Sequence, residues 1–523
     1  MSCGGMVATS QPLAAQAGVS MLLRGGNAVD SAIAAAAALN VVEPMSTGIG
    51  GDAFALVYLS KTRELKALNA SGWAPQAATP EKLRRLGYQK MPETGIHSVT
   101  VPGAFDGWCS LLEKYGTMSL AEVLAPAIEL AEKGFPVTEI IGHTWKMNSA
   151  KLRTNADAVR TYLIDGRAPE PGEIFKQPGL AKTFRKLAQG GRDAFYQGEI
   201  AEAIVACSRK NGGLLTLQDL SDYKSKWVAP ISTNYRGYDI YECPPNGQGL
   251  VALIALNILG GYDLSSLGHN SAEYLHLLIE ALKLVFADAR RYIADPESVE
   301  IPLEGLLSKS YAGQRRRLID RDKANPTAEA GVPNMGSDTV YLAATDREGN
   351  SISFINSLYH AFGSGIVVGD TVICLQNRGS MFSLEAEHPN CIAPHKRPYH
   401  TIIPAMAFKD GNLFLTFGVM GGLMQPQGHV QVLLNIIDFG MDVQTALDAP
   451  RFRYIQGGEC SFEPGIPRST LQKLSEMGHQ IVELDDPYWQ EFGGGQAIMV
   501  HPLTKALIGG SDPRKDGCAL GIW

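Results

Sequence analysis

The sequence predicts a large α/β protein, and three observations support that prediction. Helical patterns alternate with short strand patterns along the first part of the chain. An irregular connector follows from about residue 323 to residue 338, and strand patterns begin directly after it. Hydrophobic residues make up 45% of the 523 residues and charged residues 19%, so a chain of this length can bury a large core.

Apolar residues that recur every three or four positions predict the helices of the first part. These helices are expected at residues 11–23, 120–133 and 272–292. The break at Gly25-Gly26-Asn27 separates the first of them from an Ala-rich helix that should open at Asp30. Two strands are expected at residues 54–59 and 64–69, where short apolar stretches are bounded by turn residues.

The second part of the chain is predicted to be rich in strands. Asn325-Pro326-Thr327 and Gly331-Val332-Pro333-Asn334 mark residues 323–338 as an irregular connector. A β-hairpin should follow, with strands at residues 339–345 and 351–357 joined by a turn. Further elements are expected as strands at residues 366–375, 402–408 and 413–417 and as a helix at residues 431–439.

Charge and apolar runs exclude several classes of protein. The net charge of −7 and the lack of a large basic cluster argue against a nucleic-acid partner. The longest apolar run, residues 32–42, is too short to cross a bilayer. The first residues show no basic segment followed by an apolar one, and the eight Cys include no C-x-x-C pair. A cytoplasmic chain with reduced thiols and no signal peptide is therefore expected.

Thr339 stands where the connector meets a strand, which is where a self-processing precursor would place its scissile bond. A threonine hydroxyl needs a base, and the α-amine of an N-terminal threonine can act as one because its ordinary pKa is about 7.7–8.0. Before cleavage, the same hydroxyl would attack the carbonyl of Asp338. The residues alone leave a second interpretation open, in which Thr339 merely opens a strand.

The glycine-rich segment Gly418-Val419-Met420-Gly421-Gly422 follows a predicted strand. Adjacent glycines allow backbone N–H groups to approach a ligand closely, as the oxyanion of an acyl transfer requires. A plain strand-to-helix turn is the other interpretation of this segment.

Taken together, these features resemble the γ-glutamyltransferase (glutathione hydrolase) family over nearly the whole chain. The segments in common keep their order, and include Thr47-Gly48-Ile49-Gly50-Gly51-Asp52 and residues 25–34, 101–104, 115–120, 212–216, 338–341, 346–350, 362–365, 396–398, 421–422, 448–451 and 511–514. The resemblance implies a four-layer αββα sandwich of the N-terminal-nucleophile hydrolase class. It also implies that one precursor yields a large chain, residues 1–338, and a small chain, residues 339–523, which pair with each other and can form a dimer of such pairs.

The same resemblance implies roles for individual residues. Thr339 would be the nucleophile, Gly421 and Gly422 the donors to the oxyanion, and Ser357 a second hydroxyl that supports the nucleophile's amine. The expected substrate is a small-molecule amide, and the acyl group would pass to water or to an amine. No cofactor and no metal are expected.

The acyl pocket departs from the family pattern. Ser71 stands where the family has an arginine that binds the α-carboxylate of a γ-glutamyl group, and Met381 stands where it has an aspartate for the α-amine. Three further pocket positions also differ, with His400 and Thr401 in place of paired serines and Tyr359 in place of an asparagine. Because an arginine and an aspartate fix a zwitterion through charge-assisted bonds, these changes put its recognition in question.

Two substrates therefore fit the same mechanism. One is a γ-glutamyl amide such as glutathione. The other is an amide whose acyl group lacks the zwitterionic head, such as a glutaryl amide or oxamate, with Arg378 as the candidate for binding a carboxylate. A non-catalytic relative that binds a ligand without processing is a further alternative.

Other catalytic classes have weak support. Gly48-x-Gly50 is a fragment of a dinucleotide-binding motif, but it precedes a strand instead of following one. The sequence has no G-x-S-x-G elbow and no H-E-x-x-H pair. His276 and Glu280 have i, i+4 spacing on a predicted helix and are expected to form a surface or interhelix pair.

Overall fold

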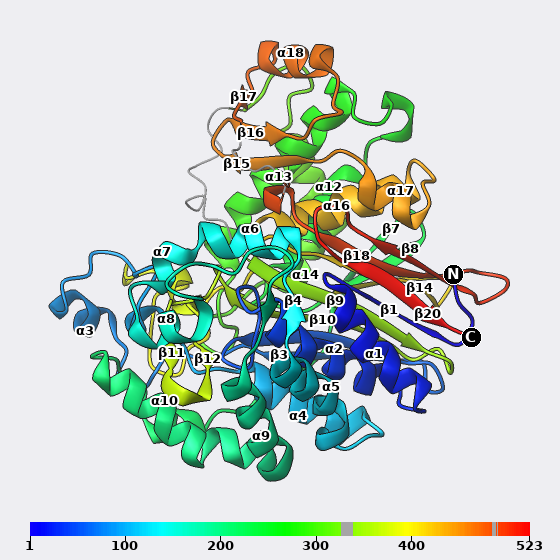
Figure 1. Ribbon diagram of the computed structural model, residues 1–523. Helices are drawn as coiled ribbons and strands as arrows, with labels where there is room; N and C mark the ends of the chain where they lie inside the picture. Colours follow the sequence, from blue (N-terminus) through cyan, green and yellow to red (C-terminus); the bar gives the residue numbers. More distant parts are fainter. Residues whose placement is uncertain (326–337, 484–487, 489) are drawn as a thin grey trace.

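The computed structural model describes residues 1–325, 338–483, 488 and 490–523. Two sheets are stacked on each other, and helices cover the outer face of each sheet (Figure 1). This arrangement confirms the αββα sandwich that the resemblance implied. The two chain ends lie close together at one side of the sandwich, where β1 pairs with β20.

The first sheet has seven strands, and all neighbouring strands are antiparallel. Its order is β20 (Cys518–Ile522), β1 (Gly5–Thr9), β9 (Asp338–Asp346), β10 (Ser351–Tyr359), β2 (Asp52–Leu59), β3 (Glu64–Ala70) and β6 (Lys226–Val228). Strands that precede and follow Thr339 are thus hydrogen-bonded within one sheet.

The second sheet has six antiparallel strands. Its order is β19 (Leu507–Ser511), β18 (Gly495–Val500), β14 (Asn412–Val419), β13 (Ala405–Lys409), β8 (Tyr238–Glu242) and β7 (Ile231–Tyr235). Apolar side chains fill the space between the two sheets, among them Phe54, Tyr341, Ile355, Met406 and Ile498. This second sheet also combines strands from both sides of Thr339, so both sheets contain strands from the two parts of the chain.

Helices cover both outer faces. Against the seven-stranded sheet pack α1 (Pro12–Leu23), α2 (Ala28–Val42), α4 (Ala104–Tyr115), α5 (Leu120–Lys133) and α9 (Pro178–Tyr196). Against the six-stranded sheet pack α12 (Gly249–Leu259), α13 (Ala272–Tyr292), α16 (Met424–Ile437) and α17 (Val443–Asp448).

Shorter elements complete the described chain. The helices are α3 (Pro80–Arg85), α6 (Glu139–Met147), α7 (Ser149–Leu152), α8 (Ala156–Tyr162), α10 (Glu199–Lys210), α11 (Leu217–Ser221), α14 (Leu303–Leu307), α15 (Lys309–Arg316) and α18 (Arg468–Glu476). The short strands are β4 (Phe135–Pro136), β5 (Ile174–Phe175), β11 (Val367–Val368), β12 (Ile373–Cys374), β15 (Phe452–Gln456), β16 (Glu459–Phe462) and β17 (Gln480–Ile481).

Several expected boundaries need correction. The Ala-rich helix begins at Ala28, because Asn27 and Asp30 form a capping box that closes its first turn. The expected strand at residues 366–375 is instead a small hairpin, β11 and β12, joined by a turn at Gly369–Thr371. The expected helix at residues 431–439 begins earlier, at Met424. Most of the expected connector, residues 326–337, lies outside the described residues.

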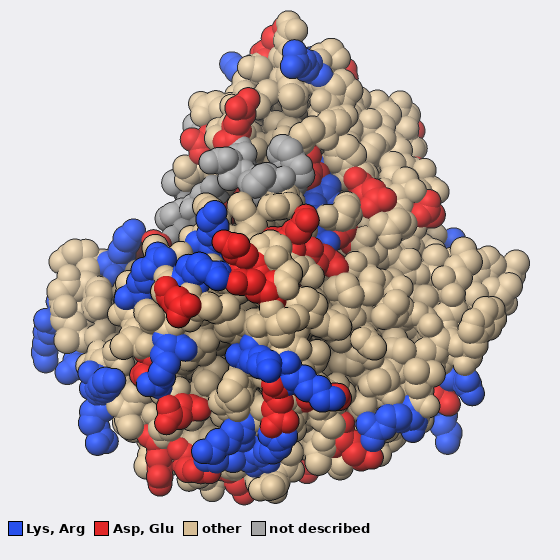
Figure 2. Space-filling model, viewed as in Figure 1, with Lys and Arg blue, Asp and Glu red and all other residues tan. Residues whose placement is uncertain are grey.

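The surface carries mixed charge. On the face shown in Figure 2, Lys and Arg side chains are intermingled with Asp and Glu side chains over the helices that cover the seven-stranded sheet. Among the described residues, no helix has both the length and the apolar character that crossing a membrane requires.

Candidate active site

Thr339 and Ser357 lie side by side on the hairpin formed by β9 and β10. The hydroxyl Oγ1 of Thr339 lies 3.0 Å from the hydroxyl Oγ of Ser357, and both side chains are buried. The register of the two strands is regular up to Asn356 and shifts before Tyr359, so Ser357 falls in an irregular part of the ladder. The backbone N–H of Tyr359 donates to Ser357 Oγ at 2.8 Å. This bond fixes the hydroxyl next to Thr339.

Arg378 lies beside the Ser357 hydroxyl, in the 3₁₀ turn η4 (Arg378–Met381). Its side chain is completely buried, and it donates to Thr401 Oγ1 at 2.7 Å and to Ser357 Oγ at 3.4 Å. Its Nε has no hydrogen-bond partner within the described part of the chain. Burial lowers the pKa of Arg378 to about 10, because the interior disfavours the charged form.

Asp52 is the acidic residue whose charge acts on the pKa of Arg378, but its carboxylate oxygens bond to other groups. Asp52 Oδ2 lies 3.0 Å from His400 Nε2, and Asp52 Oδ1 accepts from Gly72 N at 2.7 Å and Gln376 Nε2 at 2.9 Å. Burial, together with the positive charge of Arg378, lowers the pKa of His400 to about 4. His400 is therefore a neutral partner of Asp52 at neutral pH. Within the described residues, Arg378 forms no ion pair within 4.0 Å.

Gly421 and Gly422 form the turn between β14 and α16. Their φ angles are +115° and +57°, in the region that favours glycine. Their carbonyl groups accept from Met424 N at 2.9 Å and Gln425 N at 3.2 Å. Among the described residues, neither glycine N–H donates a hydrogen bond. Two unpaired N–H groups at the start of a helix suit an oxyanion.

The pocket residues that depart from the family pattern occupy different places. Tyr359 and Met381 are in contact, since the Tyr359 hydroxyl donates to Met381 Sδ at 2.7 Å. Tyr359 also lies over Arg378, with 4.1 Å between its ring centroid and the guanidinium carbon. Ser71 is buried and its hydroxyl bonds to Asn69 Oδ1 at 2.6 Å. No hydrogen bond within the described chain joins Ser71 to Thr339, Ser357 or Arg378.

A cavity of about 380 Å³ adjoins this cluster. Tyr359, Met381 and Tyr399 line it on the side of the site. Its other walls combine apolar side chains with charged ones, and include Phe286, Ala289, Ile293, Phe382, Arg84, Lys90, Glu93 and Arg290. The lining residues of α13 and of residues 84–93 were not predicted from the sequence, because nothing in their local pattern distinguishes a cavity wall from an ordinary helix face.

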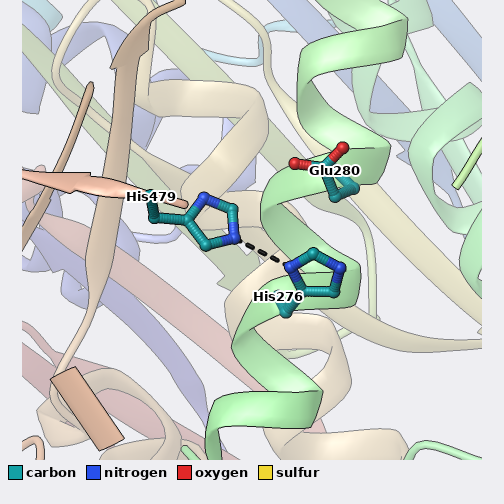
Figure 3. A group of neighbouring side chains, drawn as sticks. All are labelled: His276, Glu280 and His479. Carbon is teal, nitrogen blue, oxygen red and sulfur yellow. Dashed lines mark hydrogen bonds between the residues drawn. The ribbon is translucent and has the colours of Figure 1, made fainter. Parts of the chain in front are cut away.

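One group of side chains has the composition of a metal site. His276, Glu280 and His479 are buried, and their ligand atoms lie within 4.8 Å of one another (Figure 3). His276 Nδ1 lies 2.8 Å from His479 Nε2, and His276 Nε2 lies 2.7 Å from the carbonyl oxygen of Asp320. Because a carbonyl only accepts, His276 donates from Nε2 to Asp320.

Glu280 in this group already has a cation as its partner. Lys283 Nζ donates to Glu280 Oε1 at 2.7 Å, and Asn325 N donates to Glu280 Oε2 at 3.1 Å. The arrangement favours a hydrogen-bonded network completed by Lys283 over a metal site. It also corrects the expectation of a surface or interhelix pair, because His276 and Glu280 are both buried and each bonds to other residues.

The layered fold places a threonine at the start of an inner strand, beside a second buried hydroxyl. This is the architecture of an N-terminal-nucleophile hydrolase, a class of amide-cleaving enzymes. Residues 14–522 match the gamma-glutamyltranspeptidase family, and the chain belongs to that family.

Known proteins are similar to this chain over nearly its full length. A glutathione hydrolase-like proenzyme of Bacillus subtilis is 42% identical, over 99% of this chain and 98% of its own. An acylase proenzyme of a Pseudomonas species is 36% identical, over 99% of this chain and 93% of its own. The crystal structure of a cephalosporin acylase from Bacillus halodurans is 46% identical with a TM-score of 0.94, covering 100% of this chain and 96% of its own.

Proposed function

We propose that the chain cuts itself between Asp338 and Thr339, and that Thr339 then hydrolyses amides whose acyl group carries a carboxylate. The observation that supports this proposal most directly is the buried charge of Arg378. Its guanidinium touches Ser357, and Ser357 touches Thr339. A buried cation needs an anionic partner, and the carboxylate of a substrate that enters past Tyr359 would supply one.

Self-cleavage and turnover would use the same hydroxyl. In the precursor, Thr339 Oγ1 attacks the carbonyl carbon of Asp338, and the peptide nitrogen leaves as the free α-amine of Thr339. Water then hydrolyses the resulting ester, which frees the hydroxyl and leaves a carboxylate on Asp338. The new amine has an ordinary pKa of about 7.7–8.0 and can act as the base in turnover.

In turnover, the amine removes the proton of Thr339 Oγ1 as this oxygen attacks the substrate carbonyl. The N–H groups of Gly421 and Gly422 would stabilise the oxyanion. The amine then returns its proton to the departing nitrogen of the substrate, and an ester on Thr339 remains. Water, or an acceptor amine, attacks this ester and regenerates the hydroxyl.

The acyl group is expected to be short. Because one hydroxyl, Ser357 Oγ, contacts both Thr339 Oγ1 at 3.0 Å and Arg378 at 3.4 Å, a few bonds suffice to join the reacting carbonyl to a carboxylate bound by Arg378. Glutaryl amides and oxamate meet this condition. Met381 is neutral and bonded to Tyr359, so it offers no charged partner for an α-amine, and a non-zwitterionic acyl group suits the pocket best.

A γ-glutamyl amide is the second candidate substrate, and Glu93 is the observation that favours it. Glu93 lines the same cavity as Tyr359 and Met381. Its carboxylate could bind the α-amine while Arg378 binds the α-carboxylate. The pocket would then recognise a zwitterion with two residues other than those of the family pattern.

A matched pair of substrates tests the proposal. Glutaryl-p-nitroanilide and valeryl-p-nitroanilide have acyl chains of the same length, but only the first carries a carboxylate. Hydrogen bonds to charged groups contribute about 1.5–3 kcal/mol, so Arg378→Met should lower kcat/KM for the glutaryl amide by about 10- to 100-fold. The valeryl amide should change by less than about threefold.

Three results of this experiment would count against the proposal. An equal loss for both amides would mean that Arg378 acts on the nucleophile and not on the acyl carboxylate. Rapid cleavage of γ-glutamyl-p-nitroanilide with an inert glutaryl amide would select the zwitterionic substrate. A purified protein that runs as one chain on a denaturing gel yet hydrolyses amides would refute the assignment of Thr339.

A further inference from the structure

Gln248 lies next to the candidate site, and its side chain forms hydrogen bonds to three parts of that site. It is fully buried at the N-terminal end of α12. Its Nε2 donates to the carbonyl oxygens of Thr401 and Gly422, both at 2.7 Å. Its Oε1 accepts from the hydroxyl of Tyr399 at 2.9 Å. The side-chain amide therefore uses both its nitrogen and its oxygen for hydrogen bonds in one orientation.

The two carbonyl groups determine that orientation. A carbonyl oxygen can only accept, so the nitrogen of the amide must face Thr401 and Gly422. Turning the amide over would place its oxygen against two other oxygens and would leave two buried acceptors unpaired, which is unfavourable. The Gln248 side chain is thus locked between the two segments that it contacts.

Each partner of Gln248 belongs to a different part of the candidate site. Thr401 Oγ1 is the acceptor for Arg378 at 2.7 Å, so the position of Thr401 orients the guanidinium. Gly422 belongs to the turn whose N–H groups are unpaired among the described residues. Tyr399 lines the cavity. One amide therefore links the anion-binding residue, the oxyanion turn and the cavity wall.

The link also crosses from one part of the chain to the other. Gln248 precedes Thr339 in the sequence, whereas Tyr399, Thr401 and Gly422 follow it. The backbone adds to the connection, because Gln248 N donates to His400 O at 3.0 Å and His400 N donates to Asn246 O at 2.8 Å. After cleavage before Thr339, these bonds would join the two chains at the active site.

We infer that Gln248 is a positioning residue for acyl transfer, which holds the oxyanion turn and the Thr401–Arg378 pair in register with Thr339. This inference rests on the function proposed above. Small displacements of such groups are costly, since a misplacement of about 1 Å can reduce a rate by about 100-fold. Gln248 itself touches none of the reacting groups, so it acts through its neighbours.

Replacement of Gln248 by methionine removes its three hydrogen bonds and keeps its approximate volume. Gln431→Met is a matched control, because Gln431 is also a buried amide that donates to two carbonyls, Phe452 O at 3.0 Å and Gln427 O at 3.2 Å, and accepts from Phe452 N at 3.1 Å. Both variants lose similar bonds, and only Gln248 contacts the site.

We expect Gln248→Met to lower kcat by about 10- to 100-fold for both the glutaryl and the valeryl amide. The KM for the glutaryl amide should rise as well, because Arg378 loses its orientation. Gln431→Met should leave both parameters within about twofold of the wild type, even if its thermal midpoint falls by as much as that of Gln248→Met. Equal kinetic effects in the two variants would overturn the inference.

The variant Gln248→Glu provides a second test, and a merely structural role of Gln248 would not produce the result expected from it. The ionised carboxylate donates to neither carbonyl, whereas the protonated acid can donate to one of them. The kcat of this variant relative to the wild type should therefore rise as the pH is lowered through the pKa of the new carboxyl. A ratio that stays constant with pH would contradict the inference, and this test remains available if the methionine variant does not fold.

The rate of self-cleavage separates this inference from the proposed substrate. If the wild type cleaves itself but hydrolyses neither amide, the substrate proposal fails, and Gln248→Met should still cleave itself more slowly than Gln431→Met. Equal self-cleavage rates in that case would overturn the role of Gln248. A wild-type chain that never cleaves before Thr339 would overturn both.

Discussion

Tyr359 lies between the buried Arg378 and the cavity. Its ring centroid is 4.1 Å from the guanidinium carbon of Arg378. Tyr359 lines the cavity, whereas Arg378 is not among the described residues that do. The φ angle of Tyr359 is +82°, a conformation that is strained for a residue with a side chain. The backbone thus tolerates strain at the residue that covers the buried charge.

The pH dependence of catalysis should reveal this buried charge. Burial lowers the pKa of Arg378 to about 10, so the guanidinium is charged below that pH and loses its charge above it. The kcat/KM for glutaryl-p-nitroanilide should therefore fall above about pH 10. The valeryl amide is the control, because it has no carboxylate and its kcat/KM should not share this fall. A ratio of the two values that is constant between pH 8 and about pH 11 would contradict the role of Arg378.

Removal of the Tyr359 ring should shift the pH above which kcat/KM for the glutaryl amide falls, that is, the alkaline limb of the pH profile. In Tyr359→Ala, water can reach the guanidinium, so its pKa should rise towards the ordinary value and the fall in kcat/KM should shift to higher pH. Tyr359→Phe keeps the ring over Arg378 and loses only the hydrogen bond to Met381, so its limb should stay near that of the wild type. Identical limbs in all three proteins would show that the ring does not control the hydration of Arg378.

Thr339→Ala should abolish both self-cleavage and amide hydrolysis, because both need the hydroxyl. Thr339→Ser keeps the hydroxyl and should retain part of each activity. A denaturing gel would show one chain for the alanine variant and two chains, residues 1–338 and 339–523, for the serine variant. Release of p-nitroaniline measures turnover in parallel. Full activity in the alanine variant would refute the assignment.

Ser357→Ala should slow both reactions without abolishing them. The substitution removes the hydroxyl 3.0 Å from Thr339 Oγ1, and loss of a single positioned polar group typically lowers a rate by about 10- to 1,000-fold. Ser353→Ala is the matched control, because Ser353 is also buried on β10 but bonds to Tyr341 and Ala405. If the two variants have equal kcat and self-cleavage rates, Ser357 has no special role.

The parts of the fold that the sequence predicted have strong local determinants. α5 and α13 were predicted with the bounds that the structure has, since each begins at a serine cap and carries an apolar stripe. The hairpin of β9 and β10 was likewise expected from alternating apolar residues around a Gly-containing turn. The pairing of these strands places Ser357 beside Thr339.

The parts that were missed depend on contacts that local patterns do not encode. α16 begins at Met424, although Pro426 and Gly428 are poor helix formers, because a proline in the first turn loses no hydrogen bond of the helix. The apolar run at residues 366–375 folds into a hairpin that needs a positive φ of +62° at Val372, which β-branched residues rarely adopt. Gln248 contacts residues that lie more than 150 positions away in the sequence, so its role could not be read from its neighbours.

The buried pair of Glu280 and Lys283 on α13 should be important for stability. Only 2% and 1% of their side-chain surfaces are exposed, and they are 2.7 Å apart, so Lys283→Met would leave the Glu280 carboxylate buried without its cation. Removal of one member of such a pair typically destabilises a protein by about 3–5 kcal/mol. The double variant Glu280→Met with Lys283→Met should recover much of that loss, because it removes both charges. Thermal midpoints of the wild type and both variants test this, and a single variant as stable as the wild type would show that solvent reaches Glu280.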